Sequence, residues 1–202
     1  MSYQVLYFND AEKIIKSNRM SKIIKQTFTA IEQDLIGSPF PGTSLKHTLT
    51  DCDWRENPDN LKIIDGRRYQ YKGYRKRVAI EASLGAYEYI LEGLFRLQIV
   101  FDKGLLDTGV LILNGVRSDK SPLGESLKLV KSEIEELYPT ISLPVVVALF
   151  DVGLTDYSAD DNEAVNIESA DSVKNEKVNA VSAEIANDNN DNFEENISEV
   201  AV

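Results

Sequence analysis

The stretch KRVAIEASLG, residues 76–85, places a carboxylate within an apolar segment, where a charge is costly. Glu81 follows three apolar residues, and Ser83 falls on the same face of a strand two positions later. Further acids precede this stretch, among them Glu56 and Asp65. Carboxylates that converge on one strand supply the oxygen ligands that Mg²⁺ prefers, and a bound Mg²⁺ assists phosphodiester hydrolysis. Glu81 is therefore the first candidate for a catalytic metal ligand.

A basic run surrounds the start of the same segment. Six basic side chains lie in the eleven residues 67–77, namely Arg67, Arg68, Lys72, Arg75, Lys76 and Arg77. Basic side chains hold the phosphates of nucleic acids. The run alone also fits a solvated hairpin, but acids and bases together favour chemistry on a nucleic acid. His47 is the only histidine and has no partner at zinc-ligand spacing, so we expect a surface or loop residue there.

The net charge divides the chain into two parts. Residues 151–202 hold fourteen of the 33 acidic residues and two of the 22 basic ones, a net charge of −12, which leaves +1 for residues 1–150. Runs such as NDNNDNFEEN have no sustained apolar period and cannot bury enough surface to offset the entropy of ordering. The sequence predicts one folded domain over residues 1–150 and a disordered acidic tail over 151–202.

Cysteine content and hydropathy indicate the compartment. Cys52 is the single cysteine, so no intrachain disulfide forms, as suits a reducing environment. The start MSYQVLYFND lacks the pattern of a signal peptide, and no apolar run approaches the ~18 residues of a membrane span. We expect a cytoplasmic protein that does not enter a membrane.

Helical periodicity dominates the first part of the chain. Isoleucine, leucine and phenylalanine recur at helical spacing over residues 10–36, which predicts a long helix broken near Ser17. Residues 37–60 are rich in Pro, Thr, Asp and Asn and are expected to be irregular, with a short strand at 44–49 as the alternative.

The later segments alternate between strands and helices. Residues 61–65 and 68–72 flank a glycine turn and predict an antiparallel meander that leads into a strand over 77–82, with Glu81 near its end. Then follow a helix over 87–101, a strand over 109–114, a helix near 123–138 and a strand over 144–150. The last two strands are apolar on both faces, which predicts a mixed α/β sandwich whose later strands are parallel.

The order of these segments resembles the BamHI/BglII group of type II restriction endonucleases, members of the PD-(D/E)XK nuclease superfamily. The resemblance rests on NDAEKIIKSN, SPFPGTS, WRENP, KRVAIEAS and GLFRLQIVFDKGLLDTGVLIL, in order along residues 8–150. It implies a restriction-endonuclease-like mixed β-sheet flanked by helices. It also implies sequence-specific, Mg²⁺-dependent cleavage of double-stranded DNA by a homodimer, since a two-fold protein reads a palindromic site most simply.

The resemblance assigns roles to single residues. Glu81 matches the first carboxylate of the group's E-x-E or E-x-Q pair, a metal ligand, and Glu56 matches a further acid in a Trp-Arg-Glu-x-Pro setting. Asp65 is the candidate for the metal-bridging aspartate, although BglII-type spacing would place it at Lys72. Ser83 stands where the group has Glu or Gln, and its hydroxyl can orient the attacking water but is a poor general base. The six basic side chains of residues 67–77 are expected to bind DNA.

Two other functions remain open at this point. A serine at position 83 also fits a slow enzyme, or a catalytically inactive DNA-binding or regulatory protein on the same fold. A third reading is a protein-interaction module whose acidic tail binds a basic partner. Plasmid cleavage with and without Mg²⁺ separates the first two readings.

Overall fold

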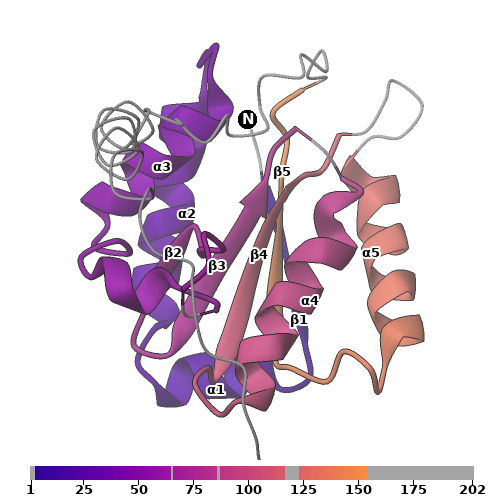
Figure 1. Ribbon diagram of the computed structural model, residues 1–202. Coiled ribbons are helices and arrows are strands. Elements are labelled where there is room, and N and C mark those ends of the chain that lie inside the picture. The colour runs from indigo at the N-terminus through magenta and orange to yellow at the C-terminus, as the bar shows by residue number, and fades with distance from the viewer. Residues whose placement is uncertain (1–2, 65, 86, 117–122, 154–202) are drawn as a thin grey trace, which may run out of the picture. The chain divides into compact units, whose positions relative to one another are not determined.

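The computed structural model describes residues 3–64, 66–85, 87–116 and 123–153 (Figure 1). Within these ranges the chain forms a five-stranded sheet of order β1-β5-β4-β3-β2. Its strands are β1 (Tyr3–Phe8), β2 (Gly73–Arg75), β3 (Val78–Ser83), β4 (Thr108–Asn114) and β5 (Val145–Phe150). The three central strands are parallel to one another, whereas β1 and β2 run antiparallel to their neighbours. The sheet is therefore mixed, as the sequence predicted.

Helices cover both faces of this sheet (Figure 1). One face carries α1 (Ala11–Ser17), α2 (Ser21–Leu35) and α3 (Pro41–Asp51), and the other carries α4 (Tyr89–Asp102) and α5 (Leu123–Leu137). A short 3₁₀ helix, η1 (Pro58–Leu61), precedes β2. Helix α4 connects β3 to β4, and α5 connects β4 to β5, because parallel neighbours need crossover connections.

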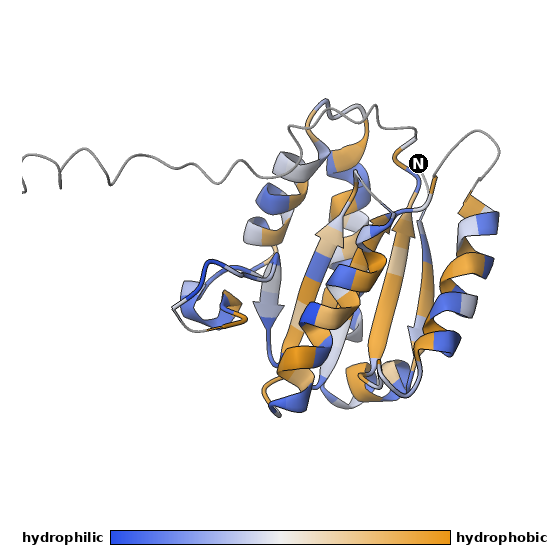
Figure 2. Ribbon diagram, turned by 45° about the vertical axis from the view of Figure 1, so that its right-hand side comes forward, coloured by the Kyte–Doolittle hydropathy of each residue, from blue (hydrophilic) through white to orange (hydrophobic). Residues whose placement is uncertain are grey.

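Alternate residues of the central strands belong to two different cores. In β3, Val78, Ile80 and Ala82 pack in the core under α1, α2 and α3. Ala79 packs on the opposite side, in the core under α4 and α5. Figure 2 shows the result, largely apolar central strands between helices of mixed hydropathy. The face of β3 that looks toward α4 carries the odd-numbered residues, Glu81 and Ser83 among them.

Most predicted elements are confirmed. The helix over 10–36 is broken as expected, into α1 and α2, and β4, α5 and β5 match their predicted positions within two residues. The meander is shorter than predicted: Lys62 and Gln70 form an isolated antiparallel bridge, and only β2 pairs with β3 as a strand.

Two parts of the sequence prediction are wrong. Residues 41–51 form helix α3, neither irregular chain nor a strand. Pro41 begins this helix, and Leu45 and Leu49 are buried at helical spacing, which overrides the weak helix propensity of its threonines. The N-terminal strand β1 was not predicted at all; it pairs with β5 and closes that edge of the sheet.

Strand β5 ends at Phe150, and the predicted domain boundary after residue 150 stays a prediction. Almost all of the acidic tail, residues 154–202, lies outside the described part of the chain, and so does its predicted disorder. Among the described helices, none combines the length and apolar character that crossing a membrane requires.

Candidate functional site

Glu81 lies inside the sheet. It is the fourth of six residues of β3, two positions before the end of the strand, near the end as the sequence predicted. The residue is 0% exposed, and it pairs in register with Leu111 of β4. Acidic side chains are almost never fully buried without a partner. Glu81 is therefore the least expected buried group of the fold and the natural centre of a site.

The two carboxylate oxygens of Glu81 have different surroundings. The hydroxyl of Tyr89 donates a 2.7 Å hydrogen bond to Oε2. Oε1 is buried and has no hydrogen-bond partner among the described residues, and Nη1 of Arg96 lies 3.8 Å from it. A distance of 3.8 Å is too long for a hydrogen bond. Within the described part of the chain, one oxygen is thus held by a hydrogen bond and the other is not.

Burial governs the electrostatics of this carboxylate. Desolvation raises the pKa of Glu81 from an ordinary 4.5 to about 7, although Tyr89, Arg96 and Lys72 each favour the ionised form and Glu92 opposes it. Burial and the neighbouring carboxylate also raise the pKa of Tyr89, which keeps its proton and remains the donor. A carboxyl group that titrates near neutral pH is typical of functional sites.

Helix α4 supplies the partners of Glu81 from one of its faces. Tyr89, Gly93 and Arg96 follow one another at spacings of four and three residues, so they lie on the same side of the helix. A Cβ on Gly93 would come within 2.6 Å of Cδ1 of Leu111, and the glycine therefore allows α4 to approach β4 closely. Because α4 lies this close to the sheet, Tyr89 and Arg96 reach Glu81.

The other residues predicted for the catalytic site lie in different segments of the chain. Glu56 is exposed in the segment WRENP, where Trp54 is a fully buried core residue. Arg55 of the same segment donates a hydrogen bond to the carbonyl of Lys72, which places the segment along β2. Asp65 lies outside the described residues. Ser83 is half-buried at the end of β3, on the same face as Glu81.

Binding of Mg²⁺ requires several oxygen ligands close together. Glu81 offers a hard oxygen without a hydrogen-bond partner, which suits one ligand position. Within residues 3–64, 66–85, 87–116 and 123–153, no three His, Cys, Asp or Glu side chains come together in a group that could hold a metal. Glu81 therefore fits one ligand position, the described residues do not complete a metal site around it, and Asp65 lies outside them.

The six predicted DNA-binding residues fall into two groups. Arg75 donates to the carbonyl of Cys52 and lies 3.5 Å from Asp53, and Arg77 forms a 2.8 Å ion pair with Asp107, so both have intramolecular partners. All six side chains are exposed or half-buried, Lys72 and Arg75 being the half-buried ones. Of the six, Lys72 contributes to the electrostatics of Glu81.

Sequence reasoning missed Tyr89 and Arg96. The helix over 87–101 was predicted from the periodicity of its mainly apolar residues, and that periodic set includes neither of them. A signal was present, since Arg96 interrupts the apolar run GLFRLQIV and lies seven positions after Tyr89, where helical side chains share a face. Only the packing of α4 on β3 reveals that this face meets Glu81.

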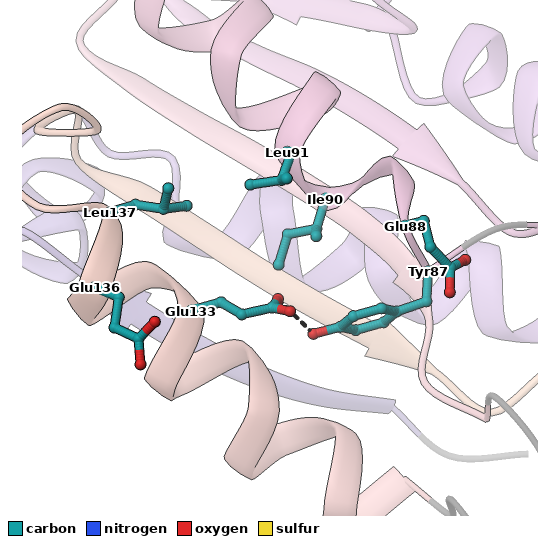
Figure 3. A pocket seen from close by; sticks show the side chains of 7 residues that line it. All are labelled: Tyr87, Glu88, Ile90, Leu91, Glu133, Glu136 and Leu137. Atoms are coloured by element: carbon teal, nitrogen blue, oxygen red, sulfur yellow. Dashed lines mark hydrogen bonds between the residues drawn. The ribbon is translucent and has the colours of Figure 1, made fainter.

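A separate cavity of about 440 Å³ opens between the start of α4 and the end of α5 (Figure 3). Its apolar wall is formed by Ile90, Leu91 and Leu137, and the hydroxyl of Tyr87 donates a 2.8 Å hydrogen bond to Glu133 across it. The cavity is lined by none of the groups that contact Glu81. It is therefore not part of the carboxylate site.

Comparison with known proteins bears on the fold. No protein-family model matches this chain, and no curated protein matches it in sequence. Among solved structures, the restriction endonuclease BglII in complex with a DNA 16-mer superposes with a TM-score of 0.50 at 13% identity, over 78% of each chain. The fold is that of a BglII-like restriction endonuclease. Free BglII gives a TM-score of 0.46 at 17% identity, over 77% of this chain and 80% of that one.

The BglII-like fold confirms the resemblance inferred from the sequence at the level of architecture. In a BglII-like mixed sheet, the face of β3 beneath α4 carries the predicted carboxylate, Glu81, together with Ser83. The roles assigned to these two residues from the sequence stay predictions.

Proposed function

We propose that this chain is a Mg²⁺-dependent, sequence-specific endonuclease that cleaves double-stranded DNA as a homodimer in the cytoplasm. The observation that carries the proposal is the Glu81 carboxylate, fully buried in a central strand of a BglII-like sheet with one oxygen lacking a hydrogen-bond partner. Buried polar atoms are nearly always paired, so an unsatisfied carboxylate oxygen favours a bound ligand. Bound Mg²⁺ would supply Lewis acidity and a water of lowered pKa.

Each residue has a defined task in this proposal. Glu81 holds the metal through Oε1, while the hydrogen bond from Tyr89 fixes the orientation of the carboxylate. Asp65 and Glu56 are the proposed further ligands, and Ser83 orients the attacking water. The exposed bases Arg67, Arg68 and Lys76, with half-buried Lys72, bind backbone phosphates, and Arg75 and Arg77 join them if DNA displaces their intramolecular partners.

A second candidate is a DNA-binding protein that does not cleave. Lys72 occupies the position where BglII-type spacing would place an aspartate, and it adds positive charge near Glu81. Ser83 contributes no strong base. A site with this charge balance retains the DNA affinity of the fold while losing the hydrolytic step.

The two candidates are separated by an assay on unmethylated DNA of high sequence complexity. Wild-type protein and Glu81→Gln, purified in parallel, are incubated with this DNA in Mg²⁺ and in EDTA. Discrete fragments from the wild type alone, and only with Mg²⁺, support the endonuclease. Intact DNA in every sample, with tight binding by both proteins, supports the binding protein. Fragments of equal yield from both proteins would refute the role of Glu81.

A further inference from the structure

Arg96 has more hydrogen-bonding capacity than its intramolecular contacts use. A guanidinium carries five N–H donors. Within the described part of the chain, the side chain of Arg96 donates one hydrogen bond, from Nη2 to Oε1 of Glu92. Its Nη1 lies 3.8 Å from Oε1 of Glu81 and does not bond it. Unused donors therefore adjoin an unsatisfied acceptor.

The position of this guanidinium is nonetheless well defined. Its Cζ lies 5.9 Å from the ring centroid of Tyr69 and 5.7 Å from that of Tyr89, within the range of cation–π contacts. The arginine side chain is 24% exposed, and its hydrogen-bonded partner Glu92 is 55% exposed. Two aromatic rings thus hold a cation whose outer edge faces solvent and already contacts an anion.

A role only as the counter-ion of Glu81 does not explain this geometry. A structural ion pair in a buried site is stabilising when the two groups also hydrogen-bond and satisfy each other. Here the hydrogen bond goes to the exposed acid, and the buried oxygen stays without one. Ser83 brings no charge to β3, so the positive charge near Glu81 comes from other elements, from Arg96 of α4 and from Lys72.

We infer that Arg96 binds a phosphate of the DNA backbone directly beside Glu81, exchanging the Glu92 carboxylate for the phosphate. The inference rests on the proposed function for its ligand, DNA. A planar guanidinium fork matches the geometry of phosphate oxygens. Because Glu81 is itself an acid, an arginine between it and the phosphate also offsets the repulsion of the two anions. Arg96 is then the residue that positions the backbone against the carboxylate.

The test measures binding of a random-sequence DNA duplex in EDTA between about 50 and 200 mM salt, for the wild type, Arg96→Met and Arg96→Lys. Loss of one phosphate contact makes the slope of log affinity against log salt concentration less steep by about 1. It also weakens binding to all DNA sequences alike. We expect this result for Arg96→Met, with the slope restored in Arg96→Lys, which keeps the charge. Arg19→Met is the matched control, because Arg19 follows α1, on the opposite face of the sheet.

The outcomes separate the inference from the proposed function. If the wild type binds DNA and Arg96→Met keeps the affinity and slope of Arg19→Met, the inference is overturned while the proposed function stands. If the wild type does not bind DNA, both are overturned. Should Arg96→Met fail to fold because it leaves Glu81 without a cation, the comparison is made between Glu81→Gln and Glu81→Gln/Arg96→Met. The same decrease in slope is expected there, and an unchanged slope overturns the inference.

Discussion

The hydroxyl of Tyr89 donates a 2.7 Å hydrogen bond to Oε2 of Glu81, from the first residue of the helix that follows the strand. This hydrogen bond links β3 to α4, and the second oxygen, Oε1, lies 3.8 Å from Nη1 of Arg96. The carboxylate is thereby oriented before any ligand binds. Preorganisation of this kind is what a site for a metal or a phosphate requires.

Glu81 makes stability depend on pH. Because burial raises the pKa of Glu81 in the folded protein to about 7 from 4.5, the folded state binds this proton more tightly than the unfolded state does. The free energy of unfolding therefore falls between about pH 4.5 and 7, by roughly 3 kcal/mol, and this contribution stays constant above pH 7. Urea unfolding gives the free energy of unfolding of the wild type and of Glu81→Gln at each pH in this range. The difference between the two proteins measures the contribution of Glu81. A difference that does not vary with pH would contradict the raised pKa.

Gly93 is predicted to be required for the close approach of α4. In Gly93→Ala the new Cβ would meet Cδ1 of Leu111 at 2.6 Å and the ring of Tyr89 at 3.2 Å, so either the buried Leu111 side chain or the helix must shift. We expect overpacking to lower the free energy of unfolding by about 1–3 kcal/mol. The higher helix propensity of alanine offsets ~1 kcal/mol of this. Gly124→Ala in the first turn of α5 is the control, since its Cβ meets nothing within 4 Å and stability should hold or rise slightly. Equal unfolding midpoints for the two variants would count against tight packing at Gly93.

The hairpin between β2 and β3 carries local strain. Lys76 and Arg77 both have positive φ, 48° and 61°, the pattern of a two-residue type I′ turn, which favours glycine or asparagine. Lys76→Gly should stabilise the protein by up to about 1 kcal/mol. Arg77→Gly relieves the same strain but removes the ion pair with Asp107, so it should gain less. Thermal unfolding of both variants tests the comparison, and a net loss in Lys76→Gly would show that the lysine side chain is needed.

The sequence predicts those elements of the fold that have a clear local pattern of apolar residues. The strands β4 and β5 are apolar on both faces, and that local pattern sufficed to predict parallel, buried strands. Helix α3 was missed because proline, threonine and histidine dominate its composition, although Leu45 and Leu49 carry the helical period. In β1 the burial pattern is irregular, because the strand lies at an edge and contributes to both cores.

The candidate site was predictable only in its centre. A carboxylate in a β-branched run is visible in the sequence, so Glu81 was found. Its partners Tyr89 and Arg96 become partners only when α4 packs across β3, a tertiary contact without a local signature. The basic run was visible in the sequence as well. Its composition could not reveal that Arg75 and Arg77 have acidic and carbonyl partners within the protein.

Ser83 allows a test by gain of function. If the site cleaves slowly because position 83 lacks a base, Ser83→Glu should raise the cleavage rate, since general-base catalysis contributes about 10²–10⁴-fold. Ser83→Gln is the control of equal size that lacks a basic carboxylate. Single-turnover cleavage under matched Mg²⁺ concentrations compares the three proteins. A Ser83→Glu variant that folds and binds metal but cleaves no faster would place the defect elsewhere in the site.

The most direct measurement of the central claim is Mn²⁺ binding, with Mn²⁺ as a spectroscopic substitute for Mg²⁺ at oxygen ligands. Electron paramagnetic resonance of free Mn²⁺ gives the affinity for the wild type, Glu81→Gln, Asp65→Asn and the surface control Glu12→Gln. If Glu81 is the centre of the site, the wild type and Glu12→Gln bind Mn²⁺ alike, Glu81→Gln loses binding, and Asp65→Asn weakens it. Undiminished Mn²⁺ binding by a folded Glu81→Gln would contradict the assignment of Glu81 as a metal ligand.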